Sequence, residues 1–270
     1  MKKLLTLLVA IMLTFTACFA LTACGGGNNV ANAIEGIEGE EFGFAIGKTS
    51  SKKTEILEAM NKVIAETDIQ AAIEYYTAVY EEKNPTNTVT LPDLSNNTKG
   101  TLKVYTESGF APFEFIDEND EVIGVDIYLM SLVCEELDMQ LQVTDMLFDG
   151  ICGKVATEDN AIGAAGITIN DERKATLDFS NPYVSSIQYI ISNKEQAFTK
   201  LEQLAGLKIG VQKGTTGSFL VDEAITKGIL KDTGATVVEY DSGPVAYTAL
   251  NTGKIDVIVL DKLPALSLVG

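Results

Sequence analysis

The stretch AGITINDER, residues 165–173, decides how the rest of the chain is interpreted. It follows a short run of apolar and small residues and ends in polar and charged ones, as expected where a buried strand gives way to a loop. Strand-like stretches are expected at 42–47, 102–106, 139–144, 161–166, 188–192, 207–212, 236–240 and 255–260, and helix-like ones near 51–66, 69–80, 126–137, 148–155, 216–227 and 244–252. This alternation predicts an α/β fold of open sheets covered by helices. Ligands of such sheets bind just beyond the carboxyl ends of the strands.

The composition excludes several classes of function. The chain has 270 residues, 46% of them apolar and 21% charged, which is typical of a globular protein. Its formal net charge of −18 argues against nucleic-acid partners, because phosphates would be repelled. The sequence contains no histidine, so catalysis by imidazole and metal sites with histidine ligands are excluded. We expect no metal and no cofactor.

The first residues indicate export. Lys2 and Lys3 precede an apolar run at 4–20, and LTAC at 21–24 is followed by three glycines. This order is typical of a secretory signal peptide, here over 1–23. The LTAC ending resembles the lipobox of bacterial lipoproteins, which implies acylation of Cys24. An ordinary signal peptide, an uncleaved anchor and acylation at Cys18 are the alternatives. We expect an extracytoplasmic protein held to the bacterial membrane by lipid.

Two thiols follow this segment. Cys134 and Cys152 lie among apolar residues, and neither belongs to a CxxC pair. This context favours buried free thiols over a disulfide or a thiol metal site.

Polar segments follow several of the expected strands. These segments are ESGFAPFEF at 107–115, FDG at 148–150, DFSNPY at 178–183 and GVQKGTTGS at 210–218, together with Asp261. With the stretch at 165–173, and over residues 102–270, they resemble the family 3 solute-binding proteins of amino-acid ABC transporters. The resemblance implies a two-lobe, type II periplasmic-binding-protein-like fold, a free amino acid as ligand, an ABC permease as partner and a monomeric chain.

The residue chemistry agrees with a zwitterionic ligand. The guanidinium of Arg173 matches a carboxylate in a bidentate manner, and Asp261 is suited to an ammonium group. The backbone N–H groups of Thr168 and Thr216 follow strands, and Thr216 would open a helix whose dipole favours an anion. Taken singly, such residues are more often surface ion pairs or helix caps.

The remaining candidate residues would surround the ligand. Phe110 and Phe148 are able to sandwich its aliphatic stem, although such residues more often belong to a core. The resemblance implies that the carbonyl of Gly166 accepts from the ammonium and that Glu107 faces the side-chain pocket. Gln212 and Thr215 would line the same site. The family commonly has aspartate where this chain has Glu107, so the identity of the amino acid, which we expect to be polar, stays open. The acidic run at 35–41 is interpreted as solvated surface.

The order of the segments departs from that of the family. The family continues past the segment around Asp261 into a returning hinge strand and two helices, whereas residues 39–83 of this chain look like that tail. The sequence therefore predicts a circular permutation, with residues 84–100 as the linker. Residues 24–38 would form a tether and enter lobe two, 39–83 and 101–186 would build lobe one, and 187–270 would build lobe two. The alternative is a truncated chain with an unrelated N-terminal helical hairpin.

Two other classes of function stay open on this fold. One is a periplasmic dehydratase-like enzyme, for which carboxylates such as Glu107 would serve as acids. The other is an amino-acid sensor domain. The absence of histidine and of paired carboxylates within one motif favours a binding protein over an enzyme.

Overall fold

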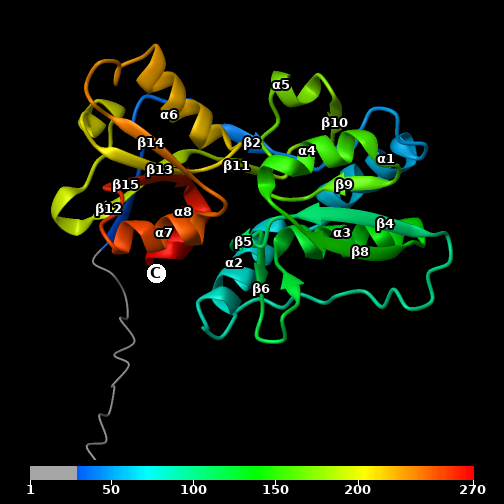
Figure 1. The fold of residues 1–270 in the computed structure, drawn as a ribbon. Coiled ribbons are helices and arrows are strands. Elements are labelled where there is room, and N and C mark those ends of the chain that lie inside the picture. Colours follow the sequence, from blue (N-terminus) through cyan, green and yellow to red (C-terminus); the bar gives the residue numbers. More distant parts are fainter. Residues whose placement is uncertain (1–28) are drawn as a thin grey trace, which may run out of the picture.

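The computed structural model describes residues 29–270, which form two lobes, each built on a five-stranded sheet (Figure 1). The predicted signal peptide at 1–23, the acylation site Cys24 and the weaker candidate Cys18 lie outside the described residues. Among residues 29–270, no helix has both the length and the apolar character that a bilayer crossing requires.

Lobe one has a mixed sheet between two layers of helices. The strand order is β10 (Leu177–Phe179), β3 (Ala45–Gly47), β9 (Ala161–Gly163), β4 (Thr101–Thr106) and β8 (Gln140–Asp145). The helices of this lobe are α1 (Lys53–Glu66), α2 (Ile69–Tyr80), α3 (Val125–Leu137), α4 (Phe148–Thr157) and the short α5 (Asp171–Lys174). Side chains of the sheet alternate between its faces, so Leu102 and Val104 share a core with α1, α2 and α3, whereas Tyr105 packs with α4.

Lobe two has the same layered construction. Its strand order is β1 (Asn29–Ala33), β12 (Gln188–Asn193), β15 (Val257–Asp261), β13 (Lys208–Gln212) and β14 (Thr236–Tyr240). The α-helices are α6 (Thr216–Thr226), α7 (Gly243–Asn251) and α8 (Lys262–Val269), and two 3₁₀ turns lie at Lys194–Gln196 and Leu201–Leu204. The core on the α6 side includes Ile209, Val211 and Val221, while Ile258 and Leu260 pack with α7 and α8 on the other face. The strands β13 and β15 end at Gln212 and Asp261.

A two-stranded ribbon joins the lobes. It pairs β2 (Glu40–Phe42) with β11 (Val184–Ser186) in antiparallel register, and Figure 1 shows it between the two sheets. The predicted single strand at 42–47 is therefore wrong, because the chain leaves this ribbon at Gly43 and enters the lobe-one sheet as β3. The N–H of Gly43 donates to the carbonyl of Ile167 at 3.0 Å, which holds the crossover against the loop after β9.

Two further local differences concern loops. The strand expected at 161–166 ends at Gly163, and Gly166 adopts a φ of +55°, a conformation that glycine tolerates best. The ring of Phe110 lies so close that a Cβ on Gly166 would sit 2.5 Å from it. A small sheet of β5 (Gly109–Phe110), β6 (Glu114–Ile116) and β7 (Val122–Ile123) was not expected from the sequence.

The segment before the linker is built into both lobes. The strand β3 lies between β10 and β9, and β1 pairs with β12 at the edge of the lobe-two sheet. The helix α8, at the far end of the chain, packs against β1. Residues 84–100 contain neither helix nor strand and connect α2 to β4. The N-terminal segment is thus not a separate helical hairpin.

Candidate functional site

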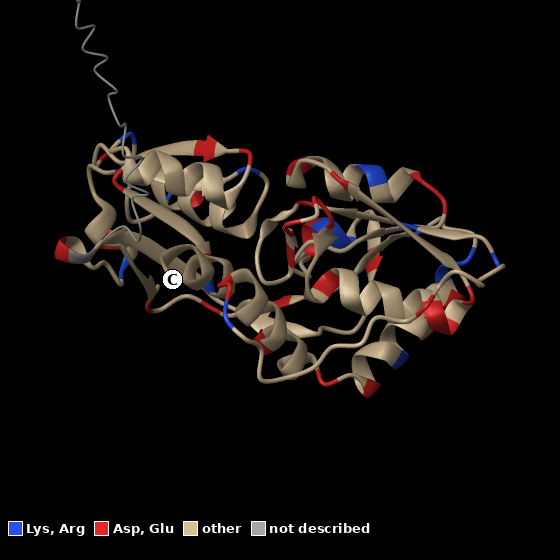
Figure 2. Cartoon of the chain, turned by 90° about the horizontal axis from the view of Figure 1, so that it is seen from below, with Lys and Arg blue, Asp and Glu red and all other residues tan. Residues whose placement is uncertain are grey.

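The predicted site residues gather where the carboxyl ends of strands from both lobes meet the ribbon. Glu107 follows β4 and Arg173 lies beyond β9 in lobe one, whereas Gln212 and Asp261 end β13 and β15 in lobe two. Acidic segments occur on both lobes, including the sides that face each other (Figure 2). The site is thus divided between two bodies that the ribbon connects.

Arg173, which is the only arginine in the sequence, is buried without an anionic partner. Its Nη1 donates to the carbonyl of Thr168 at 2.9 Å and its Nη2 to the carbonyl of Gly214 at 3.2 Å. The guanidinium lies over the ring of Phe148, 5.4 Å from the centroid. Burial lowers the pKa of Arg173, and no carboxylate of residues 29–270 forms a salt bridge with it. A buried guanidinium held only by carbonyls is suited to an incoming anion.

Asp261 presents the opposite charge under similar conditions. Its side chain is 4% exposed, and its Oδ1 accepts from the hydroxyl of Ser186 at 2.9 Å. Burial, and then the nearby carboxylate of Glu40, raise the pKa of Asp261 well above its usual range. The residue stands at the N-terminus of α8 but makes no capping hydrogen bond. Within the described part of the chain no lysine or arginine pairs with it. It is therefore suited to a cation.

Glu107 and Gln212 join the two lobes at a second point of the site. The Nε2 of Gln212 donates to Oε2 of Glu107 at 2.8 Å, and Oε1 of Glu107 accepts from the N–H of Gly109 at 3.1 Å. Burial raises the pKa of Glu107 to about 7 despite these donors. The buried Oε1 of Gln212 has no donor among the described residues. Both side chains therefore offer acceptor capacity to a group that donates hydrogen bonds.

A carboxylate that the sequence did not suggest lies at the centre of the site. Oε2 of Glu40, on β2, accepts from the hydroxyls of Thr168 at 2.5 Å and Thr216 at 2.6 Å, and Oε1 accepts from Nε2 of Gln188 at 2.7 Å. The interpretation of residues 35–41 as solvated surface is wrong for Glu40, which is half-buried. The sequence around Glu40 gave no sign of this position, because the residue is directed inward only by the pairing of β2 with β11.

Three other predicted residues have supporting positions. The hydroxyl of Thr215 donates to the carbonyl of Gln212 and accepts from the N–H of Ser218, so it caps α6. Phe110 packs against Phe113, with ring centroids 5.9 Å apart, and covers Gly166. These contacts shape the walls of the site.

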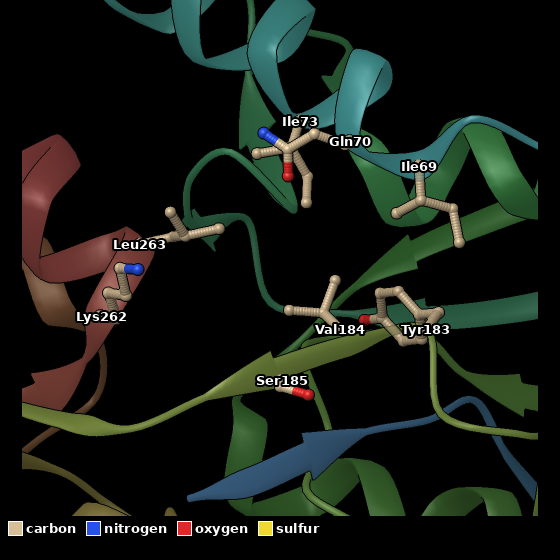
Figure 3. Close-up of a pocket in the computed structure, with 8 residues that line it drawn as sticks. All are labelled: Ile69, Gln70, Ile73, Tyr183, Val184, Ser185, Lys262 and Leu263. Carbon is tan, nitrogen blue, oxygen red and sulfur yellow. The ribbon is translucent and has the colours of Figure 1, made fainter.

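Two hollows flank these groups. A cavity of about 170 Å³ lies beside Arg173 and is lined by Phe148, Asp149, Cys152, Glu172, Arg173, Gly214 and Phe219. A larger one, of about 360 Å³, lies at the ribbon between α2 and α8 (Figure 3) and contains none of the predicted ligand residues. Cys134 is buried, Cys152 is half-buried, and both thiols are free. Over residues 29–270, no group of histidine, cysteine, aspartate and glutamate side chains is arranged to hold a metal ion.

The comparisons with known proteins agree with this architecture. Residues 102–229 match the family described as bacterial extracellular solute-binding proteins, family 3. A solved structure of an ancestral arginine-binding protein bound to arginine is 37% identical, with a TM-score of 0.57, and the similarity covers 63% of this chain and 74% of that one. The chain belongs to the family 3 solute-binding proteins.

Two further relatives show the range of this family. The L-cystine-binding protein TcyJ of Escherichia coli (strain K12) is 30% identical over 63% of this chain, and the match spans 62% of the length of that relative. The structure of an ancestral amino acid-binding protein described as a precursor of cyclohexadienyl dehydratase is 30% identical, with a TM-score of 0.56, over 62% of this chain and 73% of that one. Family 3 proteins similar to this chain thus include binders of different amino acids.

Proposed function

We propose that this family 3 protein binds a free amino acid between its lobes and delivers it to an ABC permease. The observation that carries the proposal is a buried base and a buried acid, Arg173 from lobe one and Asp261 from lobe two, neither of which forms a salt bridge within residues 29–270. An isolated buried charge is costly. A zwitterion compensates both charges at once, with its carboxylate at Arg173 and its ammonium at Asp261.

The remaining contacts support a ligand with a polar side chain. The acceptors of Glu107 and Gln212 would meet an amide, guanidinium or ammonium group. The backbone N–H groups of Thr168 and Thr216 would add donors for the carboxylate, and Phe148 would cover the ligand stem beside Arg173. Because the contributing residues come from both lobes, ligand binding would favour the closed arrangement that a permease distinguishes from the open one.

A thermal-shift screen of the twenty amino acids tests this function. A ligand present at about 100 times its Kd adds about 2.7 kcal/mol to the stability of the folded state, so a true ligand gives a clear upward shift in Tm. Arg173→Ala and Asp261→Asn should abolish that shift. A chain that responds to none of the twenty amino acids would contradict the proposal.

We expect no catalytic turnover, in keeping with relatives that are named for binding. The dehydratase alternative is tested on the same purified protein by incubating it with prephenate or arogenate and measuring product. A lipid anchor at Cys24 is also proposed. Cys24→Ser should abolish incorporation of labelled palmitate, and a variant that is still labelled would contradict that site.

We also propose that the chain is a circular permutation of the family order. The support is topological, since β3 is an inner strand of the lobe-one sheet and α8 packs against β1. A gene that begins at residue 101 and places residues 29–83 after Gly270 should yield the same fold and ligand. Failure of that rearranged chain to fold, while the original order folds, would contradict the permutation.

A further inference from the structure

The ammonium end of the proposed site contains more negative charge than a single carboxylate provides. Asp261 and Glu40 lie close enough that Glu40 raises the pKa of Asp261, after the larger effect of burial. Burial lowers the pKa of Arg173 and both acids are near enough to oppose that shift, but no cation of residues 29–270 forms a salt bridge with either side chain. Two neighbouring carboxylates in a poorly solvated place repel each other unless they share a proton or a cation binds beside them.

The donors around Glu40 do not supply that cation. Its carboxylate accepts from two hydroxyl groups, those of Thr168 and Thr216, and from the amide of Gln188. All three donors are neutral, so they fix the position of the carboxylate without cancelling its charge. Thr168 belongs to lobe one and Thr216 to lobe two, which means that Glu40 reaches the space where the lobes meet.

A second, independent feature points to a missing donor at the same place. Gln188 is 3% exposed, and its Nε2 faces Glu40 and Thr216, at 2.7 and 3.4 Å. Its Oε1 is buried and accepts no hydrogen bond from any of residues 29–270. Buried acceptors are rarely left without a donor unless a ligand or water supplies it.

Resting on the proposed function, we propose that Glu40 is a second carboxylate of the ammonium subsite, acting with Asp261 on the primary ammonium group of the bound amino acid. An ammonium has three N–H donors. Asp261 and Glu40 provide acceptors for these donors, and the buried Oε1 of Gln188, beside Glu40, is a further acceptor without a donor among residues 29–270. The subsite therefore selects for a free, primary and protonated amine, and it disfavours analogues in which this amine is alkylated or absent.

The test compares Glu40→Gln with Glu41→Gln. Both substitutions remove one negative charge from β2, but Glu41 is exposed and its side chain makes no hydrogen bond within residues 29–270. Affinity for the amino acid that gives the largest Tm shift among the twenty is measured by calorimetry. Loss of a charged hydrogen bond in Glu40→Gln should weaken binding at least about tenfold, while Glu41→Gln stays within about twofold of the wild type.

The other outcomes separate this inference from the function on which it rests. Equal affinities of Glu40→Gln and Glu41→Gln, or tighter binding by Glu40→Gln, would overturn the role of Glu40 while amino-acid binding stands. Tighter binding would mean that Glu40 repels the carboxylate of the ligand or competes with it for the donors of Thr168 and Thr216. If the wild type binds none of the twenty amino acids, both proposals fall.

A second variant covers the case in which Glu40→Gln does not fold. Glu40→Asp keeps the charge but withdraws it by one methylene group, so it should weaken binding by a smaller factor. The α-N-methyl derivative of the same amino acid provides a ligand-side check. The wild type should bind it more weakly than the parent, and equal affinity for the two would overturn the proposed selection for a primary amine.

Discussion

Two pairs of neighbouring acids in this protein differ in where they lie and in which groups surround them. Inside lobe one, Oδ2 of Asp126 accepts from the hydroxyl of Tyr183 at 2.9 Å and from the N–H of Gly166 at 3.1 Å, and Glu114 lies beside it. Burial raises the pKa of Glu114 well above its usual range and that of Asp126 to about 7. A proton held by Glu114 therefore relieves the repulsion in this pair.

The pair between the lobes, Glu40 and Asp261, is arranged differently. Neutral donors from both lobes fix Glu40, and Ser186 fixes Asp261. The opposing cation, Arg173, is held by carbonyl groups instead of either acid. The comparison teaches that burial alone does not identify a binding site. Each pair contains an acid with a strongly raised pKa, and the pair between the lobes is distinguished by its place at their boundary, where donors from both lobes converge on Glu40.

The largest effect is expected at the unpaired cation. Arg173→Ala should weaken amino-acid binding by about 100-fold or more, because the ligand carboxylate loses charged hydrogen bonds and stays buried. Calorimetric titration measures the effect. Lys174→Ala, which removes a positive charge from the neighbouring exposed residue, is the control and should bind as the wild type does. Unchanged affinity in Arg173→Ala would show that this guanidinium does not bind the carboxylate of the ligand.

The pair inside lobe one should control stability. Asp126→Ala should lower the free energy of unfolding by about 3 kcal/mol, since Tyr183 and the N–H of Gly166 lose a buried acceptor. Urea unfolding measures this change. Glu114→Gln, which replaces a protonated carboxyl group with an amide of similar size, should stay within about 1 kcal/mol of the wild type. If Asp126→Ala unfolds at the wild-type urea concentration, this pair is not structural.

The side-chain pocket should respond to pH. The pKa of Glu107 is raised to about 7 in the ligand-free protein, and a cationic side chain binds its ionised form. Affinity for L-arginine should therefore be about tenfold lower at pH 6 than at pH 8, which is about 1.4 kcal/mol. The same shift predicts that the ligand-free protein loses stability as pH rises from about 4.5 toward 7. Glu107→Gln should reduce both dependences, and an unaltered pH profile in that variant would assign them to other groups.

The smallest effect concerns the stability of the site acid. Asp261→Asn should raise the free energy of unfolding of the ligand-free protein by up to about 1 kcal/mol, because a costly buried carboxylate is replaced by a neutral acceptor for Ser186. Thermal unfolding at pH 7 measures the change. A destabilised Asp261→Asn variant would show that the protein itself compensates this charge, as it does for Asp126.

The layered α/β lobes and the polar segments after the strands could be predicted from the sequence, because both depend on local periodicity. The placement of Arg173 and Asp261 at the boundary of the lobes was also predictable, from their order among segments that resemble the family 3 proteins. Glu40 and the break at Gly43 were not, because they depend on pairing of β2 with β11, residues more than a hundred positions away. The small sheet of β5, β6 and β7 was missed because its strands are too short to show alternation.

The lobes are connected by the ribbon of β2 and β11 and not by the linker at 84–100. Residues 84–100 begin after α2 and end at β4, so both ends of this linker are fixed to lobe one. Among residues 29–270 the backbone passes between the lobes only beside β2 and beside β11. Rotation of one lobe against the other is therefore a torsion of these two strands and places no tension on the linker. Because both of its ends lie in lobe one, this seventeen-residue linker is free to vary in length without altering such a rotation.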